Sequence, residues 1–174
     1  MKILDATAGF RGIWYQKNLP FVTFMDKREG KFNAVTPNMK LKNRRSWEIK
    51  PDVVSEWKDA PFPDDYFDMV IFDPPHLIWK NERTPGALDI KYSYLKKDNY
   101  KQVLKNAFEQ LFRVLKPNGF FVLKWCDANV SVNEILKLCP YKPLYGSRSG
   151  RNDQNHWIMF CKYDVNMKLD ELIT

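Results

Sequence analysis

Histidine, cysteine and long apolar runs are all scarce in this chain of 174 residues. The two histidines, His76 and His156, are too few for a histidine-rich metal centre, so we expect no bound metal. The three cysteines, Cys126, Cys139 and Cys161, lie far apart and form no CxxC pair. This spacing favours reduced, buried thiols over disulfide bonds or a zinc site.

No apolar stretch approaches the roughly 20 residues that a membrane-spanning helix needs. No segment resembles a signal peptide either, because Met1 and Lys2 lead directly into the strand-like Ile3 and Leu4. We therefore expect no membrane partner and a cytoplasmic location. Repeats and low-complexity tracts are also missing, and the length predicts one domain over residues 1–174.

Positive charge is present in excess, with 28 Lys and Arg against 21 Asp and Glu, a net charge of +7. Residues 27–50 contain eight basic residues and two acids, and residues 80–105 contain seven and three. Tyr92, Tyr94 and Tyr100 lie in the second stretch. Basic residues interleaved with aromatics suit a surface that follows phosphates and stacks on bases. An ordinary solvated surface is the open alternative.

Apolar runs alternate with helical patterns along the chain. Strands are predicted at residues 2–5, 21–25, 53–54, 69–72, 120–125, 144–145 and 157–160. Segments 27–46 and 80–97 show no clear period, so we expect loops there. Strands that alternate with helices predict an α/β fold with a doubly wound, mostly parallel sheet.

Three helical segments are expected between these strands. Residues 13–17 predict a helical turn. Apolar residues at helical spacing predict a helix that begins at an Asp98 cap, runs to Leu115 and is stopped by residues 117–119. Ser131 and Glu134 form a capping-box pattern before a third helix.

Small or acidic residues follow the predicted strands, among them Asp5 with Gly9, Asp26, Glu56 and Asp73. In a doubly wound sheet, ligands bind beyond the carboxyl ends of the strands, at the point where the strand order reverses. Each residue alone also has an ordinary interpretation as a helix cap or turn acid. Their order along the chain is the more informative signal.

In that order, the segments resemble the class I S-adenosylmethionine-dependent methyltransferases. ILDATAGFRG resembles the first motif of that family, and FMDKR resembles its second strand with a ribose-binding acid. EWKDAPFPDDYFDMVIFDPPH resembles the third and fourth motifs, and RVLKPNGFFVLKW resembles the run into strand five. DPPHL, KPNGFFVLKW and GSRSGRNDQNHW resemble, more narrowly, short bacterial and phage-borne proteins of this class. The resemblance covers nearly the whole chain and implies a seven-stranded Rossmann-like methyltransferase sheet with S-adenosylmethionine as cofactor.

The resemblance also implies cofactor contacts. Small residues after the first strand would let the backbone approach the methionine moiety, Asp5 would face its ammonium, and Asp26 would accept from the ribose hydroxyls. Glu56 is the expected acid near the adenine, with Asp52 as the alternative if the third strand ends earlier. The full expected set is Asp5, Ala6, Thr7, Gly9, Asp26, Lys27, Glu56, Trp57 and Asp73.

Residues 73–76, DPPH, resemble the family's [DN]PP[YFWH] element, found in enzymes that methylate nitrogens conjugated to a ring or carbonyl. The resemblance makes Asp73, Pro74, Pro75 and His76 the catalytic residues. Asp73 and the Pro74 carbonyl would accept the two N–H bonds of an amine and aim its lone pair at the methyl group. His76 stands where an aromatic ring would stack on the target base. The alternative is a turn that merely ends a strand.

These observations predict an N-methyltransferase that acts on an exocyclic amine of a nucleobase in RNA or DNA. Tyr92, Tyr94, Arg148 and Arg151 are the expected substrate contacts. A methyltransferase acting on a small molecule or a protein amide is one alternative. A non-catalytic accessory subunit with the same fold is the other, and a homo-oligomer stays open.

Overall fold

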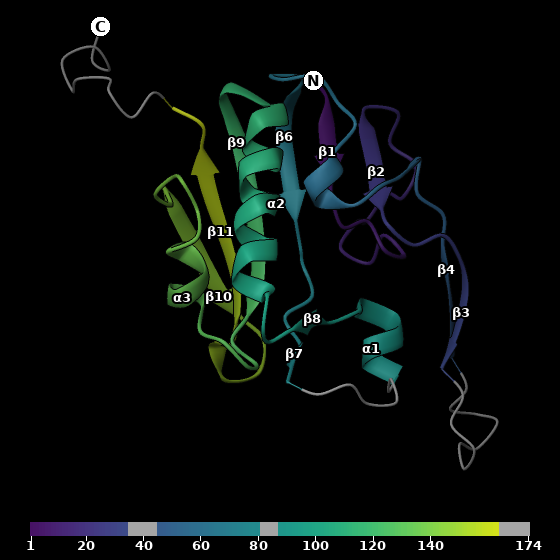
Figure 1. The fold of residues 1–174 in the computed structure, drawn as a ribbon. Coiled ribbons are helices and arrows are strands. Elements are labelled where there is room, and N and C mark those ends of the chain that lie inside the picture. Colours follow the sequence, from purple (N-terminus) through teal and green to yellow (C-terminus); the bar gives the residue numbers. More distant parts are fainter. Residues whose placement is uncertain (35–44, 81–86, 164–174) are drawn as a thin grey trace, which may run out of the picture.

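The computed structural model describes residues 1–34, 45–80 and 87–163 and is built around a seven-stranded sheet (Figure 1). The strand order is β10-β11-β9-β6-β1-β2-β5. All pairs from β5 to β9 are parallel, whereas β11 is antiparallel to both β9 and β10. The strands are β1 (Ile3–Asp5), β2 (Val22–Asp26), β5 (Val53–Val54), β6 (Phe67–Phe72), β9 (Leu115–Cys126), β10 (Tyr145–Ser149) and β11 (Asn155–Cys161). The predicted α/β fold with a mostly parallel seven-stranded sheet is confirmed.

The strand order reverses between β1 and β6. From β1 the chain runs outward through β2 to β5, and from β6 it runs the opposite way through β9 to β11 and β10. Two smaller sheets lie outside the main one: the antiparallel pair β3 (Gly30–Ala34) and β4 (Arg45–Ile49), and the parallel pair β7 (Ile78–Trp79) and β8 (Leu95–Lys96). In Figure 1, β7, β8 and the short helix α1 (Ala87–Tyr92) lie beyond the ends at which β2 and β6 terminate.

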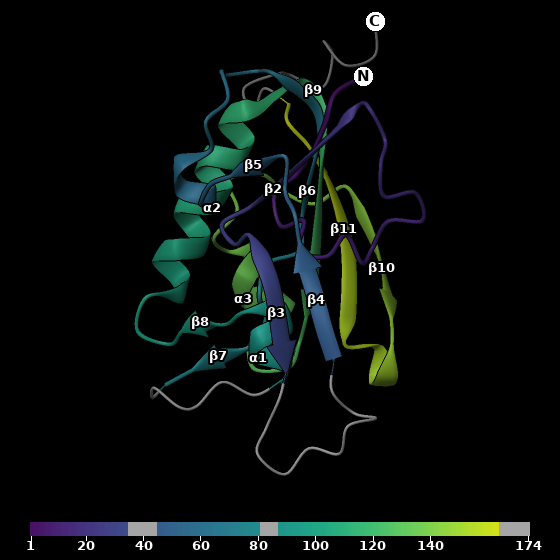
Figure 2. The same cartoon turned by 90° about the vertical axis from the view of Figure 1, so that its right-hand side faces the viewer.

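One face of the sheet is covered by α2 (Tyr100–Val114), α3 (Val132–Leu136) and the 3-10 helix η2 (Trp57–Asp59) (Figures 1 and 2). The periodic apolar residues of α2 turn toward the sheet and are fully or almost fully buried: Leu104, Ala107, Phe108, Leu111 and Phe112. They close around Phe121 of β9, whose ring stacks on that of Phe112 at a centroid distance of 4.6 Å. This aromatic packing is the main core of the domain.

The second face has no helical cover in the part of the chain that the structure describes. Over β1 and β2 it is covered instead by the segment between these strands, from which Ile13, Trp14 and Leu19 pack against the sheet. Over β9 it is partly open, because the side chain of Phe120 is 46% exposed. No helix among the described residues is long and apolar enough to cross a membrane.

Three predicted segments differ in their local structure. Residues 13–17 form turns and bends instead of a helical turn, because the Trp14 ring is held edge-on against Phe24 and its Nε1 donates to Asp5. The predicted loop at 27–46 contains β3 and the start of β4, although residues 35–44 lie outside the described part. The predicted loop at 80–97 contains α1 and β8 after its undescribed residues 81–86.

Helix ends also differ from the predictions. The N-cap of α2 is Asn99, one residue after the predicted Asp98, and it makes no side-chain capping bond. Ser131 is the N-cap of α3 as predicted, but its hydroxyl makes no capping bond, so the capping box is not formed. The chain enters β9 directly after α2, and the predicted stop at residues 117–119 is a bulge in that strand. Gly119 is required there, because a Cβ would lie 2.9 Å from the Lys116 carbonyl oxygen.

The three cysteines are unpaired and of intermediate burial, so the full burial that was predicted for them is not found. Burial raises the pKa of Cys139 to about 12, which keeps this thiol protonated at neutral pH.

Adjacent phenylalanines of β9 test the packing of the core. Phe121→Ala should lower the free energy of unfolding by about 3–5 kcal/mol, because the variant leaves a cavity among four aromatic neighbours. Phe120→Ala, on the open face, should lower it by about 1 kcal/mol or less. Urea unfolding followed by circular dichroism measures both. Equal losses in the two variants would contradict this assignment of faces.

Candidate functional site

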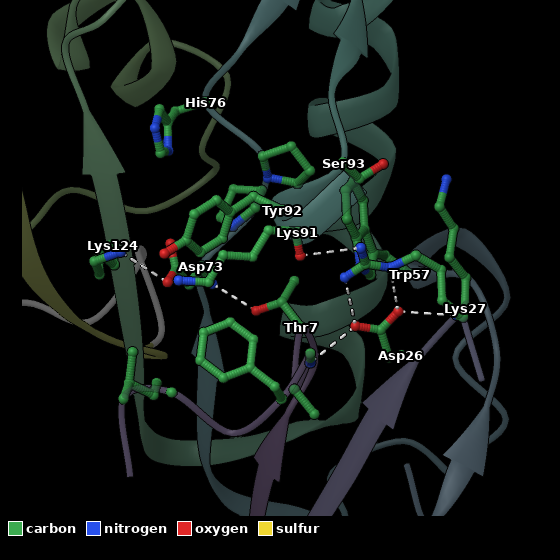
Figure 3. Close-up of a pocket in the computed structure, with 18 of the residues that line it drawn as sticks. Thr7, Asp26, Lys27, Trp57, Asp73, His76, Lys91, Tyr92, Ser93 and Lys124 are labelled. Carbon is green, nitrogen blue, oxygen red and sulfur yellow. Dashed lines mark hydrogen bonds and ion pairs between the residues drawn. The ribbon is translucent and has the colours of Figure 1, made fainter. Parts of the chain in front are cut away.

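A cavity of about 540 Å³ lies at the carboxyl ends of β1, β2 and β6, next to the point where the strand order reverses (Figure 3). Four segments line it: the turn after β1, the end of β2, residues 73–76, and the end of α1. Trp57, Lys124 and Asn155 complete the wall. Pockets that bind cofactors in proteins have volumes of this order.

The turn after β1 is hydrogen-bonded to the end of the neighbouring strand β2. The Ala8 N–H donates to the Met25 carbonyl at 3.0 Å, and the Gly9 N–H donates to the Asp26 carboxylate at 2.9 Å. Gly9 has φ +50°, a conformation that favours glycine, although a Cβ would meet no atom closer than 3.8 Å. The positive φ angle, and not a lack of room for a side chain, therefore explains why glycine occupies position 9. Thr7 and Gly9 face the cavity, whereas Ala6 is fully buried behind them.

Thr7 also joins the first turn to the DPPH segment. Its hydroxyl oxygen accepts a hydrogen bond from the Asp73 backbone N–H at 2.8 Å (Figure 3). Asp73, Pro74, Pro75 and His76 all line the cavity. The structure thus brings together the two motifs that the sequence placed 66 residues apart.

The carboxylate of Asp26 faces the cavity but is already bonded. One oxygen accepts from the backbone N–H and Nε of Arg28, at 2.9 and 3.1 Å, and the other accepts from the Gly9 N–H and from Arg28 Nη2, at 2.9 and 3.3 Å. Arg28 Nη1 reaches the carbonyl oxygens of Ile90 and Lys91 at 3.4 and 3.3 Å, so one guanidinium joins β2 to α1. The sequence motif FMDKR contains Arg28, but a side chain that reaches across to α1 leaves no local signal.

Asp73 forms an ion pair with a residue that the sequence analysis did not select. The ammonium of Lys124 donates to Asp73 Oδ2 at 2.8 Å, and both side chains are about one fifth exposed (23% and 20%). Strand alternation places Lys124 on the same face of β9 as Val122, so a charged residue inside the apolar run FFVLKW was the available signal. Burial lowers the pKa of His76; nearby Lys124 lowers it further and Asp73 raises it, so the ring is neutral at pH 7.

Asp5 does not line the cavity. Its carboxylate is 1% exposed and accepts from the Trp14 indole N–H at 2.7 Å and from the Thr7 N–H at 3.0 Å. Burial raises the pKa of Asp5 to about 6; the two hydrogen bonds oppose this, and the like charges of Asp73 and Asp26 add to it. In this structure Asp5 supports the turn from behind.

The expected adenine contacts divide between two cavities. Lys27 and Trp57 line the main cavity and an adjoining one of about 520 Å³, whereas Glu56 lines only the second. Glu56 pairs with Lys27 at 3.9 Å and with Lys58 at 3.7 Å. Asp52, the alternative acid, lines neither and accepts from the Phe24 N–H at 2.9 Å.

Two of the four expected substrate contacts lie at these cavities. Tyr92 lines the main cavity and Tyr94 the second. Arg148 and Arg151 are exposed on the β10–β11 hairpin and line neither, although Asn155 of the same hairpin reaches the main cavity. Among the described residues, no cluster of three His, Cys, Asp or Glu side chains could hold a metal ion.

Comparison with known proteins identifies the fold. No protein-family model matches this chain, and no curated protein matches its sequence. A Pyrococcus horikoshii protein superposes with a TM-score of 0.56 at 15% identity, over 92% of this chain and 81% of that one. An S-adenosylmethionine-dependent methyltransferase of Methanosarcina mazei gives 0.52 at 13% identity, over 93% and 92%. The N-methyltransferase NodS of Bradyrhizobium japonicum gives 0.50 at 11%, over 93% and 84%.

The chain therefore has the fold of the class I S-adenosylmethionine-dependent methyltransferases. The resemblance that the sequence motifs indicated is confirmed at the level of this fold. The roles of the individual site residues stay predictions.

The buried carboxyl group of Asp5 predicts a pH dependence of stability. Because its folded-state pKa is raised from 3.8 to about 6, the stabilisation from its bound proton is complete below 3.8 and is lost as the pH rises through 6. Relative to Asp5→Asn, the wild-type free energy of unfolding should fall by about 2.5 kcal/mol between pH 4 and pH 7. Urea titrations at several pH values measure the difference.

The exposed Asp153 provides the control for this experiment. Asp153→Asn should follow the wild-type curve at every pH. A constant difference between wild type and Asp5→Asn from pH 4 to pH 7 would mean that Asp5 ionises normally in the folded chain.

Proposed function

We propose that this chain is an S-adenosylmethionine-dependent N-methyltransferase that acts on an exocyclic amine of a nucleobase in RNA or DNA. One observation carries the proposal: residues 73–76 line the same cavity as the turn after β1 and the end of β2. The residues assigned to the amine thus share one volume with most of those assigned to the cofactor: Thr7, Gly9, Asp26, Lys27 and Trp57. A methyl donor and an acceptor held there are positioned for direct transfer.

The end of β2 fits a cofactor that carries a ribose and an adenine. The carboxylate of Asp26 is an acceptor and suits the two ribose hydroxyls, while the Trp57 ring offers a flat apolar wall for the base. Arg28 holds the same carboxylate oxygens in this structure, so ribose binding displaces part of its guanidinium. When bound, S-adenosylmethionine supplies an electrophilic methyl group.

The DPPH segment supplies the acceptors for the amine. Lys124 holds Oδ2 of Asp73, so Oδ1 and the Pro74 carbonyl are left for the two N–H bonds. Bonding both hydrogens turns the nitrogen lone pair toward the methyl group, which an amine conjugated to a ring requires. The methyl group would pass from the cofactor sulfur, which keeps the electron pair of the broken bond, to the nitrogen, and the nitrogen would release one proton to the Asp73 carboxylate. Negative charge beside a nitrogen that becomes positive stabilises the transition state.

The charge of the cavity favours a substrate with phosphates. Four cations line it, Lys27, Arg28, Lys91 and Lys124, against the carboxylates of Asp26 and Asp73. The sulfonium of the cofactor adds to this positive charge, so an anionic co-substrate is better accommodated than a neutral one. A neutral protein amide or small molecule gains less from this arrangement. The neutral ring of His76 suits stacking on a base.

One observation favours a second candidate, a non-catalytic accessory subunit. Both carboxylates of the cavity are paired with cations, Asp26 with Arg28 and Asp73 with Lys124. Pairs that never open would leave no acceptor for a ribose or an amine. The two experiments below distinguish a cavity whose pairs open from one whose pairs do not.

S-Adenosylhomocysteine should raise the melting temperature of the chain, because a ligand that binds only the folded state stabilises it. Asp26→Asn should lower the affinity about tenfold or more, since an amide accepts from only one of the two hydroxyls. Arg28→Met should bind as well as wild type or better, because no guanidinium then competes for the carboxylate. Isothermal titration calorimetry gives the three dissociation constants.

Asp52→Asn, which changes a carboxylate outside the cavity, is the control and should bind like wild type. Absence of any response to S-adenosylhomocysteine in wild type and in Arg28→Met would contradict the proposed cofactor. Binding of NAD instead would point to a different chemistry on this fold.

Asp73→Ala should lose methyl transfer by about 10²–10³-fold while cofactor affinity stays close to wild type, because the carboxylate acts mainly in the transition state. Asp73→Asn should retain more activity, since its amide oxygen still accepts a hydrogen bond. Incorporation of a radiolabelled methyl group into bulk RNA and denatured DNA measures the rate.

The Lys116–Asp68 pair supplies a matched control, because it joins the same two strands at 2.7 Å near their opposite ends. Asp68→Ala should keep full activity. If Asp73→Ala also kept its specific activity, residues 73–76 would be no more than a turn that ends β6.

A further inference from the structure

Three segments that are distant in sequence meet at the mouth of the cavity and form an aromatic and basic cluster. The turn after β1 contributes Phe10, the β3–β4 hairpin contributes Trp47, and α1 contributes Lys91 and Tyr92. The Lys91 ammonium lies 4.6, 5.8 and 4.5 Å from the ring centroids of Phe10, Trp47 and Tyr92. We call these four residues the rim cluster.

We infer that the rim cluster binds an unpaired nucleotide next to the target, so that the substrate is single-stranded nucleic acid. The inference rests on the proposed function and narrows its substrate class. Phe10 and Tyr92 line the cavity, and Tyr92 is 39% exposed (Figure 3). Aromatic faces at a cavity mouth suit the stacking of successive bases, which all single strands offer regardless of sequence.

The charge of Lys91 supports the same ligand. Within the described part of the chain, its ammonium contacts three rings and pairs with no carboxylate. The cation is therefore held in place by ring faces and remains able to meet an anion. A ligand that combines flat rings with phosphates at regular spacing satisfies both parts of the cluster.

The rings are not needed to fix α1 in position. Arg28 bonds to the carbonyl oxygens of Ile90 and Lys91, and the Trp79 indole N–H donates to Asp89 at 3.0 Å. These bonds hold the helix through its backbone and through Asp89, which is almost fully buried. The exposed ring of Tyr92 therefore requires a reason other than anchoring α1, and a base stacked on it supplies one.

The depth of the site excludes a base that stays in a duplex. Asp73, which would bond the amine, is only 20% exposed, and Thr7 and Lys124 contact it. An amine inside a base pair already uses a hydrogen for pairing, and both faces of its base are covered by neighbouring bases. Unpaired bases present a free amine together with free faces, so one can enter the cavity while its neighbour stacks on the rim.

Fluorescence anisotropy with a labelled 12-nucleotide strand of mixed sequence tests the inference, as RNA, as DNA and as the matching duplexes. Single strands should bind at least tenfold more tightly than duplexes. Tyr92→Ala and Trp47→Ala should each weaken single-strand binding by about 5- to 100-fold, the range for removing a stacked ring. Tyr92→Phe should restore binding, because the face of the ring is kept.

The salt dependence of single-strand affinity distinguishes the contribution of the rings from that of the Lys91 ammonium. Lys91→Met should reduce the slope of log affinity against log salt by about 0.7, the contribution of one phosphate contact on a single strand. The ring variants should leave that slope unchanged. Tyr145→Ala, which removes a 66% exposed ring on β10, is the control and should bind like wild type.

Equal affinity for strand and duplex, or unchanged single-strand binding in both Tyr92→Ala and Trp47→Ala, would overturn the inference. Thermal melting and S-adenosylhomocysteine affinity confirm that each variant is folded. If the ring variants kept both methyl transfer and single-strand binding, the role inferred for the rim cluster would be wrong and the proposed function would still hold. If strand binding depended on the rings but no methyl transfer occurred, the role of the rim cluster would hold and the proposed function would be wrong. Comparison of the RNA and DNA strands shows which backbone is preferred.

Discussion

The hydrogen bonds between the turn after β1 and its two neighbouring strands hold the whole candidate site. The Gly9 N–H bonds to Asp26, and the Thr7 hydroxyl accepts from the Asp73 N–H, so one short turn fixes the ends of β2 and β6. Parallel strands end with backbone groups that the sheet does not satisfy, and here side chains of the site satisfy them. The residues that would bind ligands are therefore the same ones that close the turn. Asp5 is buried beneath this turn, and its burial raises the pKa of its carboxyl group to about 6.

Electrostatics joins the parts of the cavity. Arg28 bonds to Asp26 and to the carbonyl oxygens at the end of α1, and Lys124 bonds to Asp73. A ligand that takes over the Asp26 carboxylate also frees Arg28, whose other contacts are on the segment that carries Lys91 and Tyr92. If the cofactor takes the Asp26 carboxylate as proposed, its binding would be coupled to the position of the rim cluster through the Arg28 guanidinium.

The fold could be predicted from sequence because its signals are local. Apolar strands, the 3.6-residue period of α2 and the acids after the strands all lie within short windows. The β3–β4 hairpin was missed because its sequence is mostly polar, and α1 was missed because its six residues are too few to show a period. Tertiary contacts decide the structure of both. Arg28 and Lys124 were missed for a related reason, since their partners are α1 and Asp73 across the fold. The sequence placed Asp5 at the turn after β1, but the spacing of residues along the chain does not reveal that its side chain is buried beneath that turn.

The last two strands have a consequence for how copies of this chain meet in solution. β10 is the outermost strand of the sheet, and all five of its residues are exposed. One side of its backbone faces solvent, which makes it a template on which a foreign strand can assemble. Its short length and the positive charge of Arg148 discourage a second copy from docking edge to edge, since like charges would be brought together. Self-association of the chain should thus depend on ionic strength, and it should be favoured at high salt, where the charge repulsion between two β10 edges is screened.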